Sequence, residues 1–259
     1  MIYLRYLRMN FKAVLEYRFS TWLLAIGQTT TTLSYFIGMS LLFLRFNSIA
    51  GFSFAEVALC FSVTGAAFTL AECFARGFDA FSRMVIQGEF DRILLRPRST
   101  IIQVLGSRTD VTRVGRLIVN ISVLCIVIPI TGINWDFSRI LTLVLMILGG
   151  AVVFTGVFIL GATVCFFTLE GLEVINIFTD GGRELASYPL PVYGKWISRF
   201  FTFIIPYGTM NYLPLMYITG RAERWPLLYM LMPLLGFVFL LPCTAVWRIG
   251  VRHYSSSGS

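Results

Sequence analysis

Long apolar stretches without a charged residue dominate this chain and limit what it can fold into. Residues 22–44 and 140–168 contain no Asp, Glu, Lys or Arg. Each is longer than the roughly 20 residues needed to cross the ~30 Å hydrocarbon core of a bilayer. Hydrophobic residues make up 57% of the sequence and charged residues only 13%, which is unlike a soluble domain. The sequence therefore predicts an all-α polytopic membrane protein.

Residues 77–116 form a long polar segment between two apolar blocks. Because short loops with excess arginine stay on the cytoplasmic side of a membrane, we expect this loop to be cytoplasmic. Its arginines outnumber its four acids, Asp79, Glu89, Asp91 and Asp110; they are Arg83, Arg92, Arg96, Arg98, Arg108, Arg113 and Arg116.

A short helix is predicted inside this loop, over residues 88–97. Acids follow Gly88 in what would be the first helical turn, and Pro97 stops the helix at about Arg96. Four apolar side chains would be available to dock onto another surface: Phe90, Ile93, Leu94 and Leu95.

The other apolar blocks give the rest of the topology. An amphipathic interfacial helix is expected over residues 2–19, and Arg248, Arg252 and His253 after the last span place the carboxyl terminus in the cytoplasm. Residues 255–259 read as a tail or linker. Both termini on one side agree with six crossings. Five of them are expected at about 22–44, 55–76, 117–133, 139–168 and 227–247.

Two local contacts are predicted within these spans. Glu72 and Arg76 stand four residues apart, the spacing of an ion pair on one helix face. Small residues in the fourth span allow close helix contact; they are Gly149, Gly150, Gly156 and Gly161.

The fifth span has two possible positions on sequence grounds. It is either the polar stretch 169–187, followed by broken helices over 188–220 that dip into the outer leaflet, or the stretch 200–219, which Pro206 and Pro214 interrupt. On a helix over 169–187, Glu173, Asp180 and Glu184 share one face with Arg183 beside them. Charged residues inside a span are functional candidates by default, although a cytoplasmic helix with a solvated face gives the same pattern.

Motifs for enzymatic chemistry are missing from the sequence. Gly194-Lys195 is followed by Trp196 and lacks the spacing of a phosphate-binding loop. There is no GxSxG or HExxH motif, and His253 is the single histidine. Five cysteines lie in apolar runs without metal or redox spacing: Cys60, Cys73, Cys125, Cys165 and Cys243. We predict that the chain is not an enzyme and holds no metal or cofactor.

The net charge of +8 comes from arginines next to apolar spans, so it points to the membrane surface and not to nucleic acid. A membrane-embedded interaction or assembly protein without transport activity fits these features as well. In that case the basic loop and the surface helix only fix the topology.

Several short strings in this order resemble the type-2 permeases of ABC exporters, most closely a bacterial subgroup of uncharacterised ABC permeases. They are Gly88-Glu-Phe-Asp-Arg-Ile-Leu-Leu-Arg-Pro97, Tyr188-Pro-Leu-Pro-Val-Tyr193 with Trp196 and Arg199, Ile205-Pro-Tyr207, and Asn211-Tyr-Leu-Pro214. The resemblance covers nearly the whole chain, including the basic amino terminus and the six spans.

This resemblance implies a coupling helix that seats in a separate ATPase subunit, present in two copies, on which ATP and Mg are bound. It also implies a second, related permease chain, as a heterodimer or else a homodimer, in the bacterial plasma (inner) membrane. The coupling residues would be Gly88, Glu89, Phe90, Asp91, Arg92, Ile93, Leu94, Leu95, Arg96 and Pro97.

The resemblance further favours 169–187 as the fifth span and 188–220 as a re-entrant outer gate. Residues of the translocation path or gate would then be Glu173, Asp180, Arg183, Glu184, Tyr188, Pro189, Pro206, Tyr207, Tyr212 and Pro214.

Overall fold

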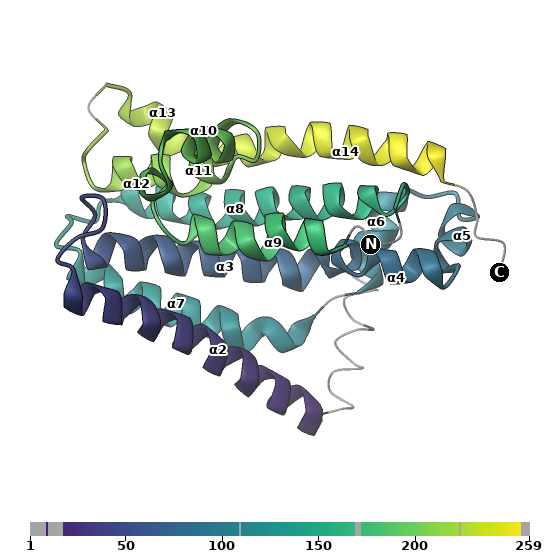
Figure 1. The fold of residues 1–259 in the computed structure, drawn as a ribbon, viewed down its shortest axis with the longest axis horizontal. Helices are drawn as coiled ribbons and strands as arrows, with labels where there is room; N and C mark the ends of the chain where they lie inside the picture. The colour runs from purple at the N-terminus through teal and green to yellow at the C-terminus, as the bar shows by residue number, and fades with distance from the viewer. Residues whose placement is uncertain (1–8, 10–17, 109, 169–171, 223, 255–259) are drawn as a thin grey trace.

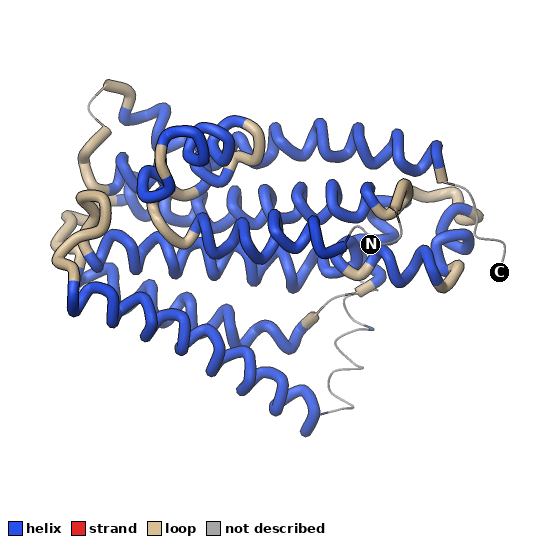
Figure 2. The backbone as a smooth tube through the Cα atoms, viewed as in Figure 1, coloured by secondary structure: helices blue, strands red, loops and turns tan. Residues whose placement is uncertain are grey.

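The structure is a computed structural model that describes residue 9 and residues 18–108, 110–168, 172–222 and 224–254. Within these ranges the secondary structure is helical, apart from one isolated bridge between Ile49 and Phe52 (Figure 2). The all-α prediction is thus confirmed. The expected interfacial helix over 2–19 and the tail at 255–259 lie almost wholly outside the described residues.

Five long helices lie side by side and run along the longest axis of the molecule (Figure 1). Neighbouring helices in contact give the order α14, α8, α3, α7, α2, and a shorter helix, α9 (Leu172–Ala186), packs across α3 and α8. The long helices are α2 (Arg18–Arg45), α3 (Phe54–Asp79), α7 (Val114–Ile130), α8 (Phe137–Val164) and α14 (Leu235–His253).

Three helical stretches in the described part of the chain are long and apolar enough to cross a membrane: Phe54–Ile86, Phe137–Val164 and Pro226–His253. They coincide with the expected second, fourth and sixth spans. The helix α7 is apolar but has 17 residues, and α9 has 15. In α2, Gln28 and the four threonines that follow it make the helix less hydrophobic.

Local sequence explains where two of the spans begin. At the start of α3, the Ser53 hydroxyl accepts a hydrogen bond from the Glu56 backbone N–H, and the Glu56 carboxylate accepts one from the Ser53 N–H at 2.8 Å. This capping box satisfies two of the free N–H groups at a helix start. Asp136 caps α8 in the same way by accepting a hydrogen bond from the Arg139 N–H at 3.2 Å.

Short helices gather at one end of the bundle, which we call the α5 end (right-hand side of Figure 1). The carboxyl-terminal end of α14 lies at the same end. The short helices are α4 (Phe81–Ile86), α5 (Glu89–Leu94), α6 (Thr100–Ser107) and η1 (Val111–Arg113).

The segment after α9 is broken into short pieces, and residues 200–219 do not form one helix. Ile204 to Pro206 separates two of these pieces, and Asn211 separates the next two. The stretch Pro226–His253 is not uniformly α-helical either, because Pro233 lies in a 3-10 turn before α14. The pieces are η2 (Leu190–Tyr193), α10 (Lys195–Phe203), α11 (Tyr207–Met210), α12 (Tyr212–Ile218), α13 (Pro226–Leu231) and η3 (Met232–Leu234).

The helix α8 ends at Val164, and residues 165–167 form turns, so the helix does not cover all of the apolar stretch 139–168. Its glycines make the close contacts that the sequence predicts. A Cβ atom at Gly149 would lie 2.3 Å from the Pro233 carbonyl oxygen, and one at Gly156 would lie 2.9 Å from the Phe239 ring. Side chains at these positions would push α14 and η3 away from α8.

Candidate functional site

The helix α5 is held at the tip of the α5 end by its neighbours on both sides. Gly88 precedes it with a φ of +67°, a left-handed conformation that glycine adopts without a steric cost. The Gln103 side-chain amide of α6 donates hydrogen bonds to the carbonyl oxygens of Ile93 and Arg98, both at 3.3 Å. The last turn of α5 and the loop after it are therefore tied to the next helix.

Phe90 anchors α5 in a cluster of aromatic rings, which we call the aromatic cluster. Its side chain is 0% exposed, and its ring centroid lies 5.0 Å from that of Phe81 and 5.4 Å from that of Phe166. Trp247 of α14 contacts Phe81 and Phe166 as well, at 5.0 and 5.1 Å. The members are Phe78, Phe81, Phe90, Phe166, Trp247 and Tyr254.

Polar contacts complete this anchor. The Trp247 indole N–H donates a hydrogen bond to the Thr100 hydroxyl of α6 at 3.1 Å. Burial, together with the Asp91 carboxylate, raises the pKa of the Tyr254 phenol to about 12. The ends of α8 and α14 are thus connected to α5 and α6 through several side chains.

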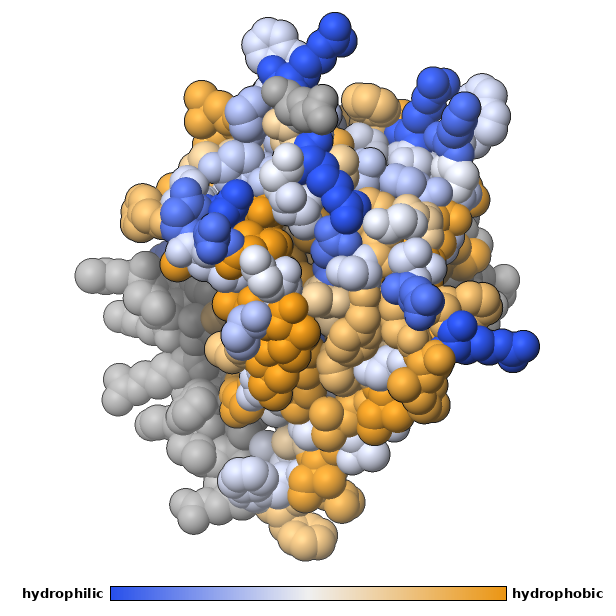
Figure 3. All heavy atoms as spheres, turned by 90° about the vertical axis from the view of Figure 1, so that its left-hand side faces the viewer, coloured by the Kyte–Doolittle hydropathy of each residue, from blue (hydrophilic) through white to orange (hydrophobic). Residues whose placement is uncertain are grey.

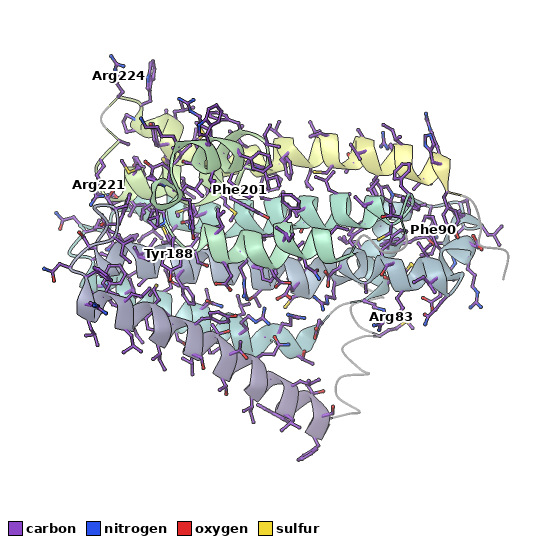
Figure 4. All side chains as sticks on the ribbon, viewed as in Figure 1. Arg83, Phe90, Tyr188, Phe201, Arg221 and Arg224 are labelled. Atoms are coloured by element: carbon purple, nitrogen blue, oxygen red, sulfur yellow. The ribbon has the colours of Figure 1, made fainter. Side chains whose placement is uncertain are left out.

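The outer surface of α5 carries apolar side chains that are not buried in the core. Leu95 is 86% exposed, and Leu94 and Ile86 are also exposed. Arg83 of α4 and Arg92 of α5 are exposed as well. Figure 4 shows Arg83 and Phe90 at this end. Of the four apolar side chains expected to face a partner, Phe90 and Ile93 are buried in the chain itself, which leaves Leu94 and Leu95.

A buried ion cluster joins three helices closer to the middle of the bundle. The Glu72 carboxylate of α3 is bound by Arg76 at 3.3 Å, by Arg116 of α7 at 2.6 Å, and by Arg113. Arg116 also donates a hydrogen bond to the Gln28 amide oxygen of α2 at 2.5 Å. The predicted Glu72–Arg76 pair is therefore confirmed, within a larger cluster that ties α2, α3 and α7 together.

A small polar cavity of about 30 Å³ lies beside this cluster, between α2, α3, α7 and α9. It has room for about one water molecule. Arg116 and Asn120 line it from α7, and Arg183 and Glu184 line it from α9. The Arg183 guanidinium pairs with Glu184 and lies 5.7 Å from the Tyr35 ring of α2. Two predicted gate residues, Arg183 and Glu184, thus line the same cavity as Arg116 of the ion cluster.

Asn211 fixes the broken segment after α9 to the rest of the bundle. Its side-chain amide donates hydrogen bonds to the Thr64 hydroxyl of α3 at 2.9 Å and to the Ala186 carbonyl at the end of α9 at 2.5 Å. Tyr207, in the same segment, donates from its hydroxyl to the Phe178 carbonyl of α9 at 2.5 Å and stacks on the Phe201 ring. The hydrogen bonds from Asn211 to Ala186 and from Tyr207 to Phe178 hold α11 against α9.

The remaining predicted gate residues are spread over the molecule. Pro189, Pro206 and Pro214 are buried residues of the segment after α9. Asp180 is exposed on α9, and the Glu173 side chain lies outside the described residues. Tyr188 and Tyr212 are half-buried. Figure 4 places Tyr188 and Arg221 toward the end opposite α5, and Figure 3, which looks onto that end, shows hydrophilic side chains scattered over a largely apolar surface.

Sequence reasoning missed the residues whose partners are far away in the chain. In the sequence, Arg116 lies at the edge of the predicted loop, Asn120 lies within a predicted span, and Asn211 belongs to a motif that indicates no contact of its own. Their signal is a polar side chain within or beside an apolar run, which marks either a cross-helix hydrogen bond or a site. Trp247 gave no such signal.

No group of three or more His, Cys, Asp or Glu side chains that could hold a metal is found among the described residues. Cys60, Cys73, Cys165 and Cys243 are buried as expected for small apolar side chains, whereas Cys125 is exposed on α7.

Three membrane-length apolar stretches that pack in one helical bundle indicate an integral membrane protein of the helical-bundle class. Residues 29–258 match the family described as ABC-2 family transporter protein. The chain therefore belongs to this family of transporter membrane subunits, which implies a separate ATPase subunit as its partner. The comparison with curated proteins and the comparison with solved structures gave no match.

Proposed function

We propose that the chain is the permease subunit of an ATP-driven ABC exporter of the bacterial inner membrane and forms half of the translocation path. The six crossings are α2, α3, α7, α8, α9 and the stretch Pro226–His253. Both termini and α5 face the cytoplasm, and α10, α11 and α12 form the re-entrant outer gate. The uninterrupted α9, packed on α3 and α8, supports its assignment as the fifth span.

The observation that carries this proposal is the two-sided construction of α5. One side buries Phe90 among residues from the ends of α8 and α14, and the other side presents Leu94 and Leu95 outward. A helix built in this way seats in a groove of the ATPase subunit and passes the movement of that subunit to the spans. A loop that only fixes the topology would need neither a buried aromatic anchor nor an exposed apolar surface.

Transport proceeds by alternating access. ATP binding draws two ATPase subunits together and moves the α5 helices inward, and hydrolysis resets them. ATP and Mg are bound by the ATPase, and this permease chain supplies no catalytic group. A second, related permease chain completes the path. The cavity beside Arg116, Arg183 and Glu184 lies where α2 and α9 approach each other, which suits a polar constriction in that path.

The coupling role is tested by replacing Leu95 with alanine. Leu95→Ala should reduce ATPase stimulation several-fold and weaken co-purification of the ATPase subunit, because it removes exposed apolar surface without touching the core. Leu44→Ala is the matched control, since Leu44 is 84% exposed at the far end of α2 and Leu95 is 86% exposed. Equal activity and association of both variants would refute the coupling role of α5.

The alternative is a membrane-embedded interaction or assembly protein without transport. It predicts that purification from the native membrane in mild detergent brings down neither an ATPase subunit nor a second six-span chain. Co-purification of both would exclude it.

A further inference from the structure

An apolar groove of about 730 Å³ opens on the surface between α8, α9 and α10. This volume lies within the roughly 300–1,000 Å³ typical of small-molecule sites. Its floor follows α8 from Val157 to Val164, about 10 Å at the rise of an α-helix, and continues to Thr168. Ile175 and Phe178 of α9 form one wall, and the end of α10 closes it near Ile204.

The helix α9 lines the groove with one side and the polar cavity with another. Ile175 and Phe178 face the groove, whereas Arg183 and Glu184 face the polar cavity on the side of α2. The helix therefore has one apolar and one polar long side, which agrees with its amphipathic sequence. The shape of the groove, long and apolar on all sides, fits a hydrocarbon chain better than a compact polar molecule.

Basic residues of α14 lie close to the Thr168 end of the groove. Phe167, the residue before Thr168, packs on the His253 ring with centroids 5.8 Å apart. Arg252 and Arg248 stand beside His253 on the last turns of α14, and both are exposed. Basic residues at a membrane surface attract anionic lipid headgroups. An anionic lipid has both matching parts: its acyl chain fits the apolar groove, and its negative headgroup fits the basic end of α14.

We infer that this groove binds an anionic phospholipid of the inner leaflet, with an acyl chain along α8 between α9 and α10 and its phosphate against Arg252 and His253. The inference rests on the proposed function only in taking the α5 end as the cytoplasmic face. Such a lipid would enter sideways from the bilayer, because the groove opens on the side of the helix bundle between α8, α9 and α10.

Photolabelling tests the site directly. The purified chain is reconstituted in phosphatidylcholine vesicles that contain a small fraction of phosphatidylglycerol with a diazirine on its acyl chain, and the labelled peptides are mapped after irradiation. We expect the label to concentrate on peptides of α8, α9 and α10 that line the groove. Label spread evenly over all lipid-facing helices, or absent from these peptides because a partner chain covers the groove, would overturn the inference.

Two variants with matched controls sharpen the result. Val164→Trp fills the groove and should cut labelling there several-fold, whereas Val144→Trp, on the same helix, should leave it unchanged; these valines are 40% and 44% exposed. Arg252→Gln should remove the preference for phosphatidylglycerol over a phosphatidylcholine carrying the same diazirine, and Arg45→Gln, at the other end of the bundle, should not. Equal labelling by both lipids in the wild type would refute the headgroup assignment.

The mapping on the wild-type chain holds even if a variant fails to fold. It also needs neither the ATPase nor transport, so failure of the lipid site and failure of the coupling role are distinguished by separate measurements.

Discussion

The rings of Phe90 and Tyr254 lie edge-on, with their centroids 5.1 Å apart and their planes at 89°. Edge-to-face pairs of this kind add about 0.5–1.5 kcal/mol to what the buried area contributes. The contact joins α5 to the residue that follows α14. The position of the helix that we propose for coupling is therefore set by the carboxyl-terminal end of the last span.

Phe90→Ala should destabilise the α5 end by about 3–5 kcal/mol, because it leaves a cavity in the aromatic cluster. The α5 helix then loses its fixed position, so ATPase stimulation should fall with the loss of order. Hydrogen exchange of the backbone amides of α5 and α6 measures the local destabilisation. Phe137→Ala is the control, since Phe137 is 82% exposed. Wild-type protection of α5 in the Phe90 variant would contradict the anchoring role.

Glu72→Gln should lower stability by about 3 kcal/mol, at the lower end of the range for breaking a buried ion pair. The loss is limited because two of the arginines keep another carboxylate: Arg76 pairs with Asp79 at 2.6 Å and Arg113 with Asp110 at 3.0 Å. Thermal unfolding in detergent gives the comparison.

Glu89→Gln serves as the reference for this change, because Glu89 is exposed on α5. If both variants unfold at the wild-type temperature, Glu72 does not hold α3 and α7 together.

The helix at α5 could be predicted from sequence because its signals are local. The acids at Glu89 and Asp91 and the proline at residue 97 bracket the helix that the structure contains, Glu89–Leu94. Which face it buries could not be predicted, because that depends on Trp247 and Tyr254, which come more than 150 residues later. When a short helix has apolar residues on both sides, its sequence does not indicate which side packs against the rest of the chain.

The ion cluster shows the same division between local and distant information. The pair of Glu72 with Arg76 follows from their spacing on one helix. Arg113 and Arg116 were counted as loop charges that set the topology, and nothing in their own neighbourhood points to Glu72. Only the packing of α7 against α3 brings them to one carboxylate.

Asn211→Asp should destabilise the protein more than Asn211→Ala. Alanine removes the hydrogen bonds to Thr64 and to the Ala186 carbonyl, at a cost of about 1–3 kcal/mol. Aspartate also places a negative oxygen where the amide N–H group faced that carbonyl. Thermal unfolding of the two variants gives the order.

The same pair of substitutions at Asn176, which is exposed on α9, should have little effect. A reversed order at Asn211, or equal effects at both sites, would show that the amide does not fix α11 to α9.

Asp110→Asn should remove part of the acid sensitivity of the protein. Asp110 lies in the loop before η1, outside the apolar spans. Burial by itself raises the pKa of this carboxyl group, but hydrogen bonds from Thr112 and Arg113 and the charge of Arg113 outweigh it, so that the pKa lies below its ordinary value. A carboxyl group with a lowered folded-state pKa stabilises the fold above its unfolded-state pKa of about 3.9, and this contribution is lost as the pH falls toward the folded-state value.

The difference in unfolding temperature between the wild type and Asp110→Asn should therefore be largest at neutral pH and shrink below about pH 4. Glu89→Gln, on the exposed side of α5, controls for the loss of one negative charge. Unfolding temperatures of all three proteins, measured in the same detergent from neutral to acidic pH, separate the loss of the Asp110 contacts from the general loss of one negative charge. A constant difference across the range would mean that Asp110 stabilises η1 without its charge, through the shape of the loop alone.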